Sequence, residues 1–160
     1  MGNLKFRYST YNLNQHIQQH LNLHRNQAIF LMRAVRDTIQ KAAKERCPVD
    51  TGNLTMSITG DVIINKKSYA ATCYVPINAP CNVEYKEIKD KNGKVIRREP
   101  CESPSNYAYW MHEGDYNLGE NSLAKQAKLG TIVGPKFITR AIEDKKAEII
   151  QNIKKALKIR

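Results

Sequence analysis

The chain has 160 residues, of which 41% are hydrophobic and 26% are charged, and this is enough apolar material for one domain with a buried core. The composition excludes collagen-like, low-complexity and wholly disordered proteins. The formal net charge of +11 indicates acidic partners, and we expect no membrane span, because every apolar run is far shorter than the roughly 20 residues of a membrane helix.

The positive charge is concentrated at the two ends of the chain. Residues 1–46 carry 8 basic and 2 acidic side chains, for a net charge of +6, and residues 136–160 carry 8 and 3, for +5. Residues 47–135 carry 10 of each and are neutral. Both ends also have helical periodicity, so we expect a basic helical surface. On the C-terminal side this surface includes Lys145, Lys146, Lys154 and Lys155.

A long amphipathic helix is predicted from Leu13 to just before Pro48. Apolar residues recur there at steps that keep one stripe on a helix: Leu13, Ile17, Leu21, Ala28, Leu31, Val35, Ile39 and Ala42. Asn12 or Asn14 can cap its start, and a break between residues 22 and 26 would fit its length to a compact domain. Pro48 ends the helix, because the residue before a proline disfavours helical angles.

A second amphipathic helix is predicted at the C-terminal end. Gly134-Pro135 opens it, since proline is well suited to a first helical turn. The apolar stripe then consists of Phe137, Ile138, Ala141, Ile142, Ile149, Ile153 and Leu157.

Between the helices the pattern changes to the alternation typical of strands. Strands are predicted at 62–64 and 69–75, joined by a polar turn, and an aromatic strand is predicted at 107–111. Residues 115–130 are polar and small and predict a long loop that becomes ordered against a partner. The order predicts an α+β fold in one domain of residues 1–160, with an antiparallel sheet and the two terminal helices packed on one face.

A β-hairpin is predicted at residues 83–100. Asn92-Gly93 lies between two strand-like segments and favours a type I′ turn. The arms carry more charge than apolar surface, so we expect the hairpin to project from the body and to contact a neighbouring subunit or another protein.

Signatures of catalysis and of metal binding are weak. The four cysteines include no C-x-x-C pair and are expected to be free thiols, and His112-Glu113 lacks the second histidine of a zinc-protease motif. His16, His20 and His24 share one helical face and are candidates for a metal site, although a solvated polar edge is the simpler interpretation. We predict no catalytic residue, no cofactor and no metal site.

The segment after the first helix has the sequence of a tight, capped turn. Asp50 is expected to accept hydrogen bonds from the next two or three backbone N–H groups, and Gly52 permits a sharp bend. Leu54 and Ile58 then predict a short helical turn before the first strand. The complete motif consists of Pro48, Val49, Asp50, Thr51, Gly52, Asn53 and Leu54.

This motif resembles the Pro-Val-Asp-Thr-Gly-x-Leu signature of tail-completion, or neck, proteins of tailed bacteriophages, the gene-product-ten-like minor virion proteins. Two further landmarks of that family have counterparts in the same order. The family strand that ends in an acidic residue and glycine is similar to Tyr107, Ala108, Trp110, Glu113 and Gly114. The family's aromatic residue after proline, at the start of the last helix, is similar to Pro135, Phe137 and Ala141.

The resemblance implies a structural virion protein without enzymatic activity. It would assemble in the host cytoplasm into a ring, with six copies expected, at the junction between head and tail. The implied partners are other copies of the chain, the head connector or portal-side protein, and the tail tube or tail terminator protein. Genome DNA would pass through the ring without specific binding. The alternative is a basic nucleic-acid-binding protein, which the excess of Lys and Arg also favours.

Overall fold

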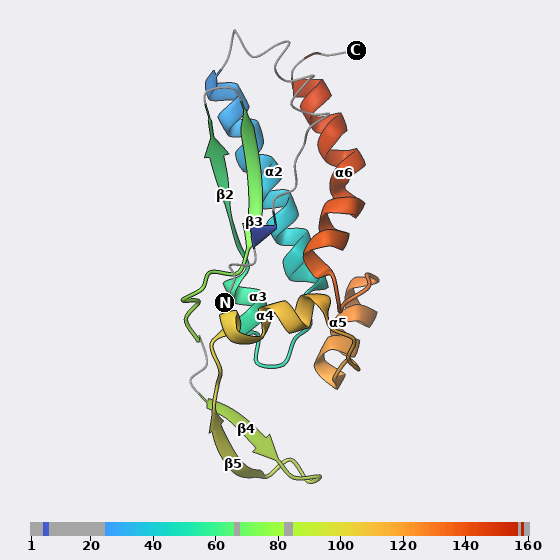
Figure 1. Ribbon diagram of the computed structural model, residues 1–160. Helices are drawn as coiled ribbons and strands as arrows, with labels where there is room; N and C mark the ends of the chain where they lie inside the picture. Colours follow the sequence, from blue (N-terminus) through green and yellow to red (C-terminus); the bar gives the residue numbers. More distant parts are fainter. Residues whose placement is uncertain (1–4, 7–24, 66–67, 82–84, 157, 159–160) are drawn as a thin grey trace.

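The computed structural model describes residues 5–6, 25–65, 68–81, 85–156 and 158 (Figure 1). Within these residues the elements follow one another as β1 (Lys5–Phe6), α2 (Arg25–Arg46), α3 (Asn53–Ser57), β2 (Thr59–Ile64), β3 (Tyr69–Tyr74), β4 (Tyr85–Lys89), β5 (Val95–Pro100), α4 (Pro104–Glu113), α5 (Glu120–Leu129) and α6 (Phe137–Ala156). The predicted α+β class is confirmed.

A small antiparallel sheet forms one side of the body. Strands β2 and β3 pair along their whole length, from Thr59 opposite Tyr74 to Ile64 opposite Tyr69, which confirms the two predicted strands. Strand β1 adds to the other edge of β3, giving the order β1-β3-β2. The predicted alternation also holds, because Ala71 and Cys73 are buried on one face of β3.

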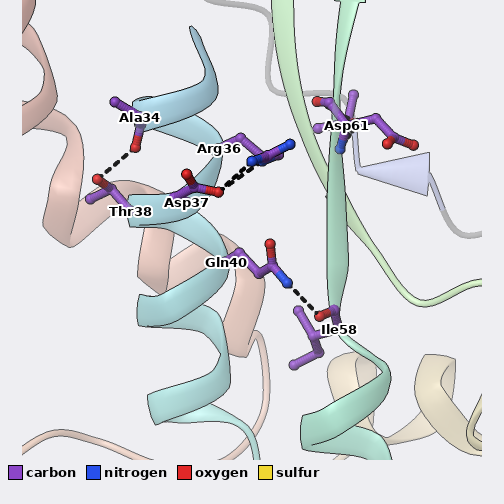
Figure 2. Close-up of polar contacts among 8 residues, drawn as sticks. Ala34, Arg36, Asp37, Thr38, Gln40, Ile58 and Asp61 are labelled. Carbon is purple, nitrogen blue, oxygen red and sulfur yellow. Dashed lines mark hydrogen bonds and ion pairs between the residues drawn. The ribbon is translucent and has the colours of Figure 1, made fainter. Parts of the chain in front are cut away.

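Helix α2 lies between this sheet and helix α6 (Figure 1). The side chain of Gln40 donates a hydrogen bond to the carbonyl oxygen of Ile58, 3.0 Å away, at the start of β2 (Figure 2). The approach is close at Gly60, where an added Cβ would lie 2.4 Å from the carbonyl oxygen of Thr72 and 2.8 Å from Cγ of Arg36. Glycine is therefore required at this position by close packing rather than by a turn.

The two long helices run antiparallel, with the start of α2 and the end of α6 at the same end of the molecule (Figure 1). Their buried faces share one core with Leu54, Ile58, Ala71, Cys73 and Ala108. At the other end, the buried Arg46 guanidinium donates to the Asp144 carboxylate at 2.5 and 3.0 Å. This ion pair fixes the C-terminal end of α2 against the second turn of α6.

The predicted hairpin is present and projects away from the rest of the body (Figure 1). Its turn differs from the prediction. A type I′ turn needs positive φ at both central residues, but of Asn92 and Gly93 only Gly93 has it, at 81°. The Gly93 N–H donates to the Asp90 carbonyl oxygen, so the loop is a three-residue turn with glycine in the left-handed position. The Asp90 side chain, which accepts from the N–H groups of Asn92 and Lys94, stabilises this alternative.

The prediction of a strand at 107–111 is wrong, because these residues belong to helix α4. Proline occupies the first helical position, where its missing N–H has no cost. The buried residues of the segment, Pro104, Ala108 and His112, follow the helical spacing of four. The aromatic composition favoured a strand, but burial against the core selects the helix. The residues assigned to the family strand, Tyr107, Ala108, Trp110 and Glu113, are therefore helical, and Gly114 caps the helix.

The prediction of a loop over 115–130 is also wrong in its second half. Helix α5 occupies 120–129 and ends at Gly130, whose φ of 61° gives the left-handed C-terminal cap. The start of the C-terminal helix needs a smaller correction: Pro135 precedes the first helical residue, Phe137, by two positions. Lys136, with a φ of 56°, stands between them and accepts the first helical hydrogen bond, from Arg140.

The predictions for residues 7–24, including the helix start and His16, His20 and His24, lie outside the described residues. In the part of the chain that the structure covers, no helix is both long enough and apolar enough to cross a membrane.

Candidate functional site

A cleft of about 810 Å³ lies between the turn at 48–54, the base of the hairpin, helix α4 and the segment 116–122. The turn at 48–54, which carries the sequence motif, thus forms one wall of this cleft. Its floor is apolar and aromatic, with Leu54, Tyr107, Met111, Tyr116 and Leu118 among the lining residues.

The turn itself forms as the sequence predicts, except at Asp50. Gly52 adopts a left-handed φ of 87°, and its carbonyl oxygen accepts from the Met56 N–H at 3.0 Å to begin helix α3. The side chain near the start of this helix that accepts a backbone N–H is Thr51, from Asn53 at 3.4 Å. Asp50 was expected to have this role; instead, its carboxylate forms an ion pair with Lys86 on strand β4.

The Asp50–Lys86 pair connects the turn to the base of the hairpin. Both side chains are well exposed, at 65% and 45%, so water competes for each of them. An exposed pair of this kind contributes only about 0–1 kcal/mol. The pair therefore biases the direction of the hairpin without fixing it rigidly to the body.

Helix α5 is fastened to the same turn by one serine. The buried Ser122 hydroxyl accepts from the Val49 N–H at 2.9 Å and donates to the Val49 carbonyl oxygen at 3.1 Å. The turn backbone between Pro48 and Gly52 belongs to no helix or strand. The Ser122 side chain therefore satisfies both the N–H and the carbonyl group of Val49. Asn121 adds a longer bond to the carbonyl oxygen of Asp50, at 3.4 Å.

Lys125, one turn further along α5, caps the end of helix α2. Its Nζ donates to the carbonyl oxygens of Lys44 and Cys47, at 2.6 and 2.8 Å. Both belong to the last turn of α2 or follow it, where helical carbonyls have no intrahelical partner and the helix dipole favours a cation. Burial lowers the pKa of Lys125, and the same burial raises the pKa of the Cys47 thiol to about 12. Cys47 is thus protonated and a poor nucleophile.

Two tyrosines in the cleft are neutral phenols. Burial raises the pKa of Tyr107 and of Tyr116 to about 12. The Tyr116 hydroxyl donates to the carbonyl oxygen of Met111 at 2.7 Å, which holds the segment after α4 against that helix. These groups can give hydrogen bonds and apolar contact to an occupant of the cleft, but neither can act as a base at neutral pH.

The cleft side of the molecule is acidic although the chain is strongly basic. From residue 99 to residue 122 the sequence contains five carboxylates and no lysine or arginine: Glu99, Glu102, Glu113, Asp115 and Glu120. Three of them, Glu99, Glu102 and Glu120, line the cleft together with Asp50. A basic or polar partner therefore fits this wall better than an anionic one.

His112 connects helix α4 to the start of helix α6. Its side chain is buried, Nδ1 lies 2.7 Å from the Glu113 carboxylate, and its ring meets Phe137 edge-on with centroids 5.0 Å apart. The His112 carbonyl oxygen accepts from the Lys136 N–H at 2.6 Å. Desolvation lowers the pKa of His112, while the hydrogen bond to Glu113 raises it, and the net direction is down. His112 therefore packs in the core between helix α4 and the start of helix α6.

All three landmarks meet in one core. Leu54 of the turn, Ala108 of α4, and Phe137 and Ala141 of α6 belong to the same buried cluster. The remaining residues that the sequence analysis predicted lie outside this core. Asn92 and Gly93 form the hairpin tip; Lys146, Lys154 and Lys155 are exposed on α6; and Lys145 is half-buried and pairs with Glu148 at 2.7 Å.

Metal binding finds no support in the described residues, where no cluster of three or more histidines, cysteines or carboxylates is placed to hold an ion. The four cysteines are free thiols, with Cys47 and Cys73 buried.

Ser122, Lys125 and the Arg46–Asp144 pair were not found by the sequence analysis. Helix α5 had a usable signal, since Glu120–Leu129 is rich in Ala, Leu, Lys and Gln and lies between two glycines. Lys125 and Arg46 carried no local signal, because their partners are 78 and 98 residues away.

No known protein family, no characterised protein and no solved structure significantly matches this chain.

Proposed function

We propose that this protein is a structural virion protein that forms a ring at the head–tail junction of a tailed phage, joining the head connector to the tail. The proposal begins from three sequence landmarks that occur in the order of the neck-protein family. It is supported by their packing, since residues of all three landmarks belong to one core cluster and residues of the first two line one cleft. The role is one of assembly, without catalysis.

The observation that carries the proposal is the projecting hairpin. Residues 85–98 are exposed with the exceptions of Ile88 and Asp90, which are partly buried. An isolated two-stranded ribbon is at best marginally stable in water, and both its edges offer unpaired backbone groups. A ribbon that extends away from its own body in this way is suited to contact with a second protein chain (Figure 1).

The distribution of charge supports a stacked position between other proteins. The ends of α2 and α6 that lie together carry Arg25, Lys154 and Lys155, all exposed, and the hairpin projects from the opposite end (Figure 1). A basic end of this kind complements an acidic face on the connector or on the tail tube. Complementary charges then set the orientation and the rate of docking more than the final affinity.

Negative-stain imaging of the purified protein, alone and mixed with the connector or with tail tubes, tests this function. We expect closed rings that bind at the end of one of these assemblies. A protein that remains monomeric and binds neither assembly would refute the proposal.

Nucleic-acid binding is the second candidate, because the same exposed lysines can neutralise phosphates. Replacing Lys146, Lys154 and Lys155 by Glu separates the two functions. The neck function predicts slower docking to the virion partner at low salt, with the fold intact. A nucleic-acid-binding protein would instead show DNA affinity that falls steeply with salt and is lost in this variant, with no effect on assembly.

A further inference from the structure

We propose that the tip of the β4–β5 hairpin docks into the acidic cleft of a second copy of this chain, so that subunits join head to tail. This inference rests on the proposed ring function and identifies the contact that builds the ring. A hairpin on one surface and a cleft on another form a heterologous interface, and such an interface closes into a ring when its rotation permits.

The hairpin tip carries the charge opposite to that of the cleft. Beyond its base, residues 88–97 contain four basic side chains, Lys89, Lys91, Lys94 and Arg97, against one acidic side chain, Asp90, for a net charge of +3. The cleft is lined by four carboxylates, Asp50, Glu99, Glu102 and Glu120. Asp50 and Glu99 form ion pairs with Lys86 and Arg97 of the same chain's hairpin, so Glu102 and Glu120 are the carboxylates that remain for an incoming cation. In a chain of net charge +11, this acidic wall is an exception, and the hairpin is a cationic segment that extends from the body.

The apolar groups have the same complementary arrangement. Val95 and Ile96 are exposed at the start of strand β5, flanked on both sides by a cation, Lys94 and Arg97. The cleft is lined by apolar and aromatic residues, among them Leu54, Tyr107, Met111, Tyr116 and Leu118, as well as by the carboxylates. An apolar centre with a polar rim is the usual organisation of a protein interface. The exposed isoleucine is the natural anchor for the aromatic floor.

Trp110 extends the receiving surface. It is not itself a lining residue, but it follows the lining residue Tyr107 by three positions, and residues at this spacing are neighbours on a helix surface. Its side chain is 68% exposed and lies edge-on to Tyr109, with ring centroids 5.7 Å apart. Tryptophan is enriched among the residues that dominate the binding energy of protein interfaces.

The hairpin does not fill the cleft of its own chain. Its base lines that cleft through Lys86 and Glu99, and the strands then lead away from α4 and α5 (Figure 1). The weak Asp50–Lys86 pair leaves the direction of the hairpin adjustable, which suits a segment that must meet a neighbouring subunit.

Two charge-reversed variants test the docking. Lys91→Glu with Lys94→Glu reverses the tip, and Glu102→Lys with Glu120→Lys reverses the cleft; circular dichroism and the melting temperature verify the fold of each. Alone, each variant should need about tenfold or more the wild-type concentration for half-maximal assembly, because like charges then meet at the contact. An equimolar mixture should assemble again, because each reversed tip meets a reversed cleft. Native mass spectrometry should show equal numbers of both variants in each ring.

Trp110→Ala supplies an independent test with a matched control. It should weaken assembly by a factor similar to that of the charge variants and leave the melting temperature unchanged. Phe30→Ala on helix α2 removes an aromatic side chain of similar exposure, 71%, from outside the cleft and should have no effect.

The outcomes separate this inference from the function on which it rests. Variants that assemble as well as the wild type, or a mixture that is not rescued, would overturn the docking and leave the neck function standing. A reversed tip that assembles normally but no longer binds DNA would assign the hairpin to nucleic acid instead. Wild-type oligomers that depend on the tip and the cleft but bind neither connector nor tail tube would retain the docking and refute the neck function.

Discussion

Replacing Lys125 by Met should destabilise the protein by about 2–3 kcal/mol, because this side chain reaches from helix α5 to cap the end of helix α2. The Nζ–O distances of 2.6 and 2.8 Å to Lys44 and Cys47 are those of charge-assisted hydrogen bonds. Each such bond contributes about 1.5–3 kcal/mol, and favourable interaction with the helix dipole adds about 0.3–1 kcal/mol. Burial of the ammonium group, which also lowers its pKa, opposes these gains and keeps the net effect below their sum.

Urea unfolding followed by circular dichroism measures this loss, with Lys128→Met as the matched control. Lys128 lies three positions after Lys125 on helix α5 and is exposed, so its replacement should change stability by less than about 0.5 kcal/mol. For a chain of this length, a loss of 2–3 kcal/mol corresponds to a fall in the melting temperature of about 4–12 °C. If Lys125→Met were as stable as the control, the capping role would be wrong.

The lowered pKa of Lys125 also predicts a pH dependence. Below its folded pKa, Lys125 is protonated in both states and stability is constant. Between the folded pKa and the unfolded value near 10.5, the unfolded chain binds more protons, so wild-type stability gains a contribution that increases with pH. This alkaline contribution should be missing from the difference curve of Lys125→Met.

Three further predictions concern single residues. Burial lowers the pKa of His112, so the protein should lose stability as the pH falls below about 6.5, by up to about 1.4 kcal/mol per pH unit. In urea unfolding, His112→Gln should reduce this loss of stability at acid pH. Gly60→Ala should cost about 1–3 kcal/mol, since the new Cβ would lie 2.4 Å from the carbonyl oxygen of Thr72; a wild-type melting temperature would show that the sheet and helix move apart easily. Asp50→Ala should cost less than about 1 kcal/mol, because it removes an exposed ion pair with Lys86, whereas a larger loss would restore the capping role expected from the sequence.

The elements that sequence alone predicted correctly have strong local signals. Helices α2 and α6 have long apolar stripes, β2 and β3 alternate around a polar turn, and the hairpin is marked by Asn92-Gly93. In these segments, local preference and tertiary packing select the same structure.

The predictions were wrong, or a contact was missed, where local preference and tertiary packing favour different structures or where the partner residue is distant in the sequence. In α4, aromatic residues favour a strand, but burial of Ala108 and His112 against the core selects a helix. In the candidate site, the turn at 48–54 was identified, but the cleft was not. Its other walls come from α4, from the base of the hairpin and from residues 116–122, and only the folded chain brings these segments together.

The mass of the purified wild-type protein in native mass spectrometry tests the central claim most directly. A ring of six copies of the 18.3 kDa chain predicts one closed species of about 110 kDa, which should persist on dilution and be absent from the tip-reversed variant. A single monomeric species at every concentration, with the connector present or absent, would contradict the account.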